Sequence, residues 1–155
     1  MHQVCLLIGS NIQPERNLPL SVTLLKKVMP VLQVSSVWES ATIGSDGPNM
    51  LNAAILVSTP LEADDLKEQV LRPLEAQMGR VRTSDKNAPR TIDLDIIFFD
   101  QHCLEPNLWH YAFRAVPVAQ VLPDTPSEAG ESLKDAADRL AQHTPIWIRR
   151  DVEIQ

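Results

Sequence analysis

The segment from Ile92 to Phe99 constrains this chain more than any other, because it places two carboxylates inside the pattern of a buried strand. Four apolar residues recur with strand periodicity and are expected on one face: Ile92, Leu94, Ile96 and Phe98. The opposite face is expected to hold Asp93 and Asp95, followed by Ile97 and Phe99. Two like charges about 7 Å apart on one face repel each other and resist removal from water. The sequence therefore predicts an interior strand beside a positive group that compensates both carboxylates.

Length and composition indicate a globular protein and exclude several classes of function. The chain has 155 residues, 44% of them hydrophobic and 22% charged, so we expect one domain over residues 1–155. A net charge of −6 gives no indication of a nucleic-acid partner. No run of 18 apolar residues occurs, so we expect neither a membrane span nor a signal peptide. Cys5 and Cys103 lie far apart without metal-ligand spacing, which favours free thiols in a reducing cytoplasm.

Hydrophobic periodicity divides the chain into strands and helices. Strands are predicted at residues 3–8, 31–40, 51–58, 92–99 and 146–152, and helices at residues 14–29, 61–77 and 132–143. Turn formers predict loops at residues 41–49 and 123–130, and the segment around Trp109 is expected to be irregular. The order β-α-β-β-α-β predicts an α+β fold of the ferredoxin-like, split βαβ type, with helices packed on an antiparallel sheet.

A cationic loop leads directly into the strand that carries the aspartates. Between Gly79 and the strand, the acid Asp85 is outnumbered by four cations: Arg80, Arg82, Lys86 and Arg90. A solvated surface loop and a structural ion network with the aspartates are two interpretations. The third is a site for a polyanion and a divalent cation, since magnesium binds carboxylates together with phosphate oxygens, and arginine matches phosphate geometry. Asp93 and Asp95 would then each hold one of two metal ions about 4 Å apart.

The cationic loop and the aspartate strand together resemble a known signature. The residues from Lys86 to Ile97, KNAPRTIDLDII, are similar to the signature of the 6-hydroxymethyl-7,8-dihydropterin pyrophosphokinase family. Further matches follow in order along most of the chain, at residues 7–11, 51–54, 75–82, 116–117 and 122–124. The resemblance implies transfer of pyrophosphate from ATP to the hydroxymethyl group of the pterin, with release of AMP, in folate biosynthesis. We accordingly expect a cytoplasmic monomer whose partners are these two small molecules.

The resemblance also assigns the reaction to charged residues around the strand. Asp93 and Asp95 match the family's ligands for two magnesium ions, which bridge the phosphates of ATP. Arg80 and Arg90 match its catalytic arginines. A further set lies at positions on the ATP side of the family's site: Arg72, Glu75, Arg82, Lys86, Ile96, His110 and Tyr111. Arg72 stands where a glutamine is common in the family.

Five residues match positions that bind the pterin: Ser40, Ala41, Ile43, Asn52 and Phe113. On this resemblance Asn52 reads the edge of the ring, the segment from Ser40 to Ile43 offers backbone partners, and Phe113 stacks on the ring. A strand-end cap for Asn52 and a core position for Phe113 are the alternatives.

Three departures from the family pattern bear on substrate binding. Met50 stands where an aromatic residue is usual, and Asn87 where the loop can carry a tryptophan. The stretch before Phe113 is several residues shorter than in typical members, so His110 and its neighbour align in two registers, and Arg114 could replace a missing arginine. Two other functions stay open: a non-catalytic or repurposed relative that binds pterin or nucleotide, and another magnesium-dependent nucleotidyl- or phosphotransferase.

Overall fold

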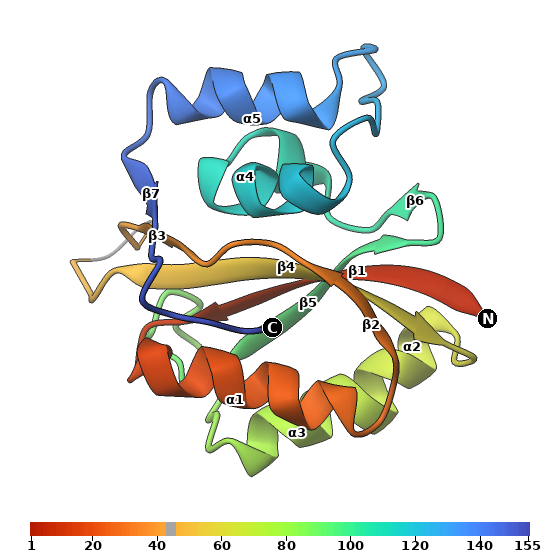
Figure 1. Ribbon diagram of the computed structural model, residues 1–155. Coiled ribbons are helices and arrows are strands. Elements are labelled where there is room, and N and C mark those ends of the chain that lie inside the picture. The colour runs from red at the N-terminus through yellow and green to blue at the C-terminus, as the bar shows by residue number, and fades with distance from the viewer. Residues whose placement is uncertain (43–45) are drawn as a thin grey trace.

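The computed structural model describes residues 1–42 and 46–155, and an antiparallel sheet forms its centre (Figure 1). The seven described strands are β1 (His2–Ser10), β2 (Val31–Val34), β3 (Trp38–Ser40), β4 (Met50–Thr59), β5 (Asp93–Phe99), β6 (His102–Cys103) and β7 (Ile146–Ile148). Their order in the sheet is β6-β5-β1-β4-β3-β7, and β2 also pairs with β4. The predicted α+β class with an antiparallel sheet is confirmed.

Helices cover both faces of the sheet (Figure 1). On one face lie α1 (Pro14–Lys26), α2 (Ala63–Leu66) and α3 (Arg72–Gln77), the last two joined by the π-helical turn η1 (Lys67–Leu71). On the other face lie α4 (Ala112–Val121) and α5 (Leu133–Ala141), preceded by the 3-10 turn η2 (Pro106–Trp109). Each face therefore buries its own apolar cluster, as a sheet covered on both sides requires.

Helix α4 follows the segment predicted to be irregular around Trp109, in a stretch for which the sequence predicted no helix. Pro117 lies inside this helix, and a proline removes one backbone hydrogen bond and disfavours the helical interior. The helix forms nevertheless, because Ala115 and Val118 are completely buried against the sheet and α5. Tertiary burial, and not local propensity, determines this element.

A β-bulge in β5 changes which face its two phenylalanines occupy. Leu6 of β1 pairs with Ile96, whereas the residue before Leu6 pairs with Phe98, so Ile97 is an extra residue. The expectation that Phe98 shares a face with Ile96 is therefore wrong, because Phe98 packs in the cluster under α4. The expectation that Phe99 shares the face of the aspartates is also wrong, because Phe99 packs in the cluster around α1.

Two predicted strands are shorter than expected. The strand predicted at residues 31–40 is divided into β2 and β3, because Ser35 meets Ala54 of β4 partly through its side chain. Ser35 N donates to Ala54 O, and Ser35 Oγ accepts from Ala54 N, both at 2.8 Å. The strand predicted at residues 146–152 ends at Ile148, and a turn follows it.

The structure also bears on the expected thiols and on membranes. Cys5 is buried and Cys103 is exposed, and both are free, as the sequence predicted. Within the described ranges, none of the helices has the length and apolar character that a membrane crossing needs.

Candidate active site

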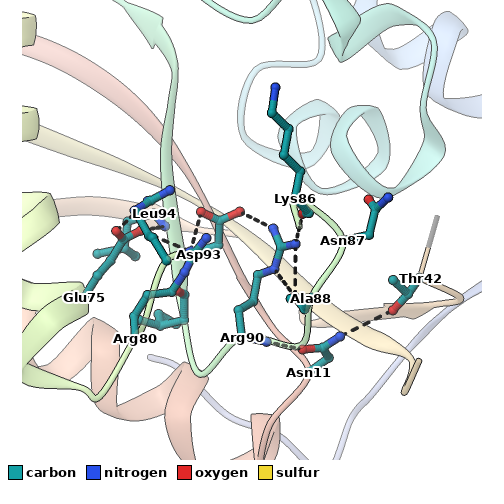
Figure 2. Close-up of polar contacts among 12 residues, drawn as sticks. Asn11, Thr42, Glu75, Arg80, Lys86, Asn87, Ala88, Arg90, Asp93 and Leu94 are labelled. Carbon is teal, nitrogen blue, oxygen red and sulfur yellow. Dashed lines mark hydrogen bonds and ion pairs between the residues drawn. The ribbon is translucent and has the colours of Figure 1, made fainter. Parts of the chain in front are cut away.

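Asp93 and Asp95 begin β5 on the face that α4 and α5 cover, and two arginines bind the first of them (Figure 2). Arg80 Nη1 lies 2.9 Å from Asp93 Oδ1, and Arg90 Nη1 lies 3.2 Å from Asp93 Oδ2. Burial raises the pKa of Asp93, but the charges and hydrogen bonds of the two arginines outweigh burial and hold the pKa below its ordinary value. The ion network expected between loop and strand therefore exists at this aspartate.

Asp95 lies two residues farther along the same face, in a different environment. Its side chain makes no hydrogen bond or ion pair within the described part of the chain. Burial, and then the charge of Asp93, raise the pKa of Asp95 to about 7, against the smaller opposing effects of Arg72 and Arg114. A bound cation would relieve this destabilisation of the ionised carboxylate.

Charged side chains bind the free edge of β5, which β6 does not reach at Leu94. Glu75 Oε2 accepts a hydrogen bond from Leu94 N at 2.8 Å, and Arg72 Nη1 donates to Leu94 O at 3.2 Å. Arg80 Nη1 donates to Ile92 O at 2.8 Å. Backbone groups at a sheet edge need partners. Here the partners are the same charged residues that surround the aspartates, so hydrogen bonds to the strand edge hold the arginines close to the aspartates.

Glu75 is the centre of this arginine cluster, and its side chain is only 2% exposed. Glu75 Oε1 lies 2.9 Å from Arg72 Nη1 and 2.7 Å from Arg82 Nη2. Glu75 Oε2 lies 3.6 Å from Arg80 Nη1. One buried carboxylate thus forms ion pairs with three guanidinium groups and fixes their positions.

The cationic loop begins at a glycine that ends α3. Gly79 has a φ of 86°, Gly79 N donates to Ala76 O, and Arg80 N donates to Glu75 O, which is a helix C-terminal motif that favours glycine. This turn returns Arg80 to the edge of β5. Beyond it Arg82 is half exposed and Lys86 is exposed. The loop and both aspartates line a cavity of about 240 Å³.

Asn11, for which the sequence suggested no role, connects two of the loops around the site (Figure 2). Asn11 Oδ1 accepts from Arg90 N at 2.7 Å, and Asn11 N donates to Arg90 O at 3.1 Å. Asn11 Nδ2 lies 3.5 Å from both Thr42 Oγ1 and Pro48 O, in the loop after β3. The sequence showed a match to the family at residues 7–11, but it did not indicate a contact with residue 90.

The expected pterin residue Asn52 lies in the same row across the sheet as Asp93, with Gly9 between them. Asn52 pairs with Gly9 in β1, and Gly9 pairs with Asp93 in β5. A Cβ at Gly9 would lie 2.6 Å from Asn52 Oδ1, so only glycine leaves this space open. Two buried polar atoms on this face, Asn52 Nδ2 and Ser40 Oγ, have no hydrogen-bond partner within the described residues. They offer hydrogen bonds to a flat polar ligand.

The other expected pterin residues lie around this face. Ala41 is exposed after β3, and Ile43 lies outside the described residues. Phe113 is half-buried at the start of α4, with its ring centroid 5.5 Å from that of Tyr111. The guanidinium of Arg114 lies 5.0 Å from the centroid of the Phe113 ring, and Arg114 Nε is buried without a partner in the described ranges.

Two residues expected on the ATP side are not brought to the aspartates. His110 lines another cavity, of about 1410 Å³, with Phe98 and Asp100 at the far end of β5. The side chain of Ile96 packs in the cluster around α1, on the opposite face from Asp95. In the described part of the chain, no three His, Cys, Asp or Glu side chains form a metal site by themselves.

Comparison with known proteins agrees with this geometry. A family model described as 7,8-dihydro-6-hydroxymethylpterin-pyrophosphokinase matches residues 5–123. The chain is 32% identical over 128 residues to a Synechocystis 2-amino-4-hydroxy-6-hydroxymethyldihydropteridine pyrophosphokinase, covering 76% of this chain and 65% of that protein. It is 31% identical over 140 residues to the Bacillus subtilis protein of the same name, covering 83% of each. For the Pseudomonas aeruginosa protein, the identity is 29% over 147 residues, covering 87% of this chain and 90% of that protein.

Proposed function

Because the chain belongs to the 7,8-dihydro-6-hydroxymethylpterin-pyrophosphokinase family, we propose that it transfers the pyrophosphoryl group of ATP to 6-hydroxymethyl-7,8-dihydropterin and releases AMP. The hydroxymethyl oxygen forms a bond to the β-phosphorus of ATP and loses its proton. The bond from that phosphorus to the oxygen bridging the α-phosphate breaks, and AMP leaves. The chain is on this basis an ATP-dependent diphosphotransferase of folate synthesis.

Asp93 and Asp95 hold two magnesium ions together with the phosphates of ATP. Two carboxylates suit magnesium, which retains waters and phosphate oxygens as its other ligands. The unpaired, desolvated Asp95 supports this assignment, because its ionised form gains most from a cation. Magnesium, when bound, neutralises phosphate charge and orients the reacting oxygens.

The arginines that bind Asp93 are the proposed catalytic pair. Arg80 and Arg90 hold Asp93 when no substrate is bound. Their guanidinium groups lie beside the carboxylate that would hold a cation, where they would stabilise charge developing on the phosphates. Arg72, Arg82 and the exposed residue Lys86 contribute further positive charge on the ATP side.

Several residues expected on the ATP side take more specific roles. Glu75 acts on ATP through the arginines that it fixes, because its own oxygens face them and the strand. The strand edge at Ile96, and Tyr111 with Arg114 near α4, complete the nucleotide side.

The pterin lies against the row that contains Asn52 and Gly9. Asn52 Nδ2 and Ser40 Oγ bond its polar edge, and Phe113 stacks on its ring. Ala41 and Ile43 belong to the segment that would offer backbone partners. The observation that carries the proposed function is the position of Asn52 and Asp93 in one row, separated by a glycine. That arrangement supports a pterin bound beside the phosphate that it attacks.

The test is AMP release from ATP with magnesium, measured by chromatography with and without the pterin. We expect AMP only when the pterin is present, in equal amount to the pyrophosphorylated pterin. Asp95→Asn is the matched control and should form no AMP. A folded chain that binds ATP and pterin but releases no AMP would contradict catalysis and favour a binding protein. AMP or ADP formed with other alcohols would favour a different phosphotransferase.

A further inference from the structure

Arg149, beyond the part of the chain that the family model matches, bonds to the strand that leads into the proposed pterin site. Arg149 Nη1 lies 2.6 Å from Glu39 Oε1 in β3, and Arg149 N donates to Val37 O at 2.8 Å. Asp151 Oδ2 also lies 2.8 Å from Arg149 Nη2, but the Asp151 side chain is 63% exposed, whereas that of Glu39 is only 16% exposed. The C-terminal residues thus reach back to β3 by side chain and backbone.

Glu39 carries the contact from Arg149 to the far end of the loop after β3. Glu39 Oε2 accepts a hydrogen bond from Asn49 Nδ2 at 2.9 Å. Ser40, where the loop begins, pairs with Met50, which follows Asn49. The Glu39 carboxylate, in the strand before the loop, therefore bonds both Arg149 and Asn49, which lies at the end of the loop.

The two faces of β3 separate this contact from the proposed pterin site. Successive residues of a strand point to opposite faces, so Ser40 faces the pterin row and Glu39 faces α1. Arg149 Nη2 lies 3.5 Å from Glu15 Oε1 in α1, which fits that side. The C-terminal residues run on this side of the sheet (Figure 1), where Val152 and Ile154 are buried in the α1 cluster. Arg149 therefore acts on the loop without lying in the pocket.

We propose that Arg149 is a positioning residue for the pterin, because it fixes Glu39 of β3 and, through Glu39, the contact of Asn49 with this strand next to Ser40. The inference rests on the proposed function, which assigns this loop to pterin binding. It also gives the C-terminal residues a role in substrate affinity that is separate from the fold of the matched region. Arg149 has no part in binding ATP or in the transfer step.

The test compares Arg149→Met, which keeps an apolar stem but removes the charge, with the unsubstituted chain. We expect the KM and Kd for the pterin to rise about tenfold, with KM for ATP and kcat changed by less than about twofold. Amide hydrogen exchange at residues 46–50 should become faster. Arg139→Met is the matched control, because Arg139 makes a comparable ion pair with Glu131 at 3.0 Å, away from the loop.

Two further variants separate positioning from general stability. Arg149→Lys should recover part of the pterin affinity, because it retains the charge but not the forked geometry. The double variant Asn49→Ala with Arg149→Met should bind the pterin as tightly as Asn49→Ala alone, since both residues act through Glu39. An unchanged pterin Kd and unchanged exchange in Arg149→Met, even with a lower Tm, would overturn the inference. Absence of pterin binding by the unsubstituted chain would overturn the proposed function, and the exchange measurement would still report whether Arg149 holds the loop.

Discussion

Asp93 and Asp95 share one face of β5, yet their pKa values are shifted in opposite directions from the ordinary value. Asp93 lies between Arg80 and Arg90, and its pKa is lowered. Asp95 has no such partner, and burial together with the charge of Asp93 raises its pKa to about 7. The site therefore contains one carboxylate that arginines neutralise and a second that a bound cation would stabilise. This difference suits a site that binds metal and phosphates together.

Replacing Asp95 with Asn should stabilise the ligand-free protein above neutral pH. The folded pKa is about 7 and the ordinary value is 3.8, so between them the folded state binds more protons than the unfolded state. The stability of the parent chain consequently falls as pH rises through this window. We expect Asp95→Asn to gain about 1–3 kcal/mol at about pH 8, with no gain below about pH 4 and no activity.

Urea unfolding at the two pH values measures this effect. Asp100→Asn is a suitable control, because hydrogen bonds from His2 and from Gln3 N lower the pKa of Asp100, and its removal should give no gain. Equal stability of parent and Asp95→Asn at both pH values would show that Asp95 is not destabilised.

Replacing Glu75 with Gln should lower kcat/KM for ATP more than kcat/KM for the pterin. The amide retains an oxygen for Leu94 N but removes the charge that fixes three arginines. We expect kcat/KM for ATP to fall about 10- to 100-fold and stability to fall by about 1–3 kcal/mol. Steady-state kinetics with each substrate varied checks this. Glu62→Gln, which removes the charge of a largely exposed carboxylate beside His2, should leave both constants unchanged.

Replacing Gly9 with Ala should damage the pterin site through Asn52. The new methyl group would lie 2.6 Å from Asn52 Oδ1, so the amide must move. We expect pterin Kd to rise about tenfold or more, and stability to fall by about 1–3 kcal/mol. Calorimetric titration and thermal unfolding measure the two effects. In an Asn52→Ala background the stability cost should shrink, and a full cost there would show that the clash lies elsewhere.

Replacing Arg114 with Met should move the acid limb of the pH–rate profile. Arg114 lowers the pKa of Asp95, opposing burial and Asp93, so its removal raises that pKa further. Because kcat/KM reports the free enzyme, the acid limb should shift upward by about half a pH unit. A profile that does not move would place Arg114 outside the electrostatic influence of the aspartates.

Much of this site was predictable because its signals are local. The strand pattern at residues 92–99, the two aspartates and the adjacent cations all lie in one continuous stretch. Their proximity in the structure, with Arg80 and Arg90 on Asp93, follows directly from that adjacency. Asn11 was not assigned a role, because its partner Arg90 is 79 positions away in sequence and nothing local indicates it.

The α+β class, the aspartate strand, the cationic loop and the resemblance to the family could all be predicted from the sequence. The bulge at Ile97, the helix at Ala112–Val121 and the hydrogen bond of Glu75 to the β5 edge could not, because they depend on tertiary contacts. Side-chain periodicity is a local property and is written along the chain. A register shift, the burial of a helix that contains Pro117, and the partner of an open strand edge depend on contacts with residues distant in sequence, which no local pattern records.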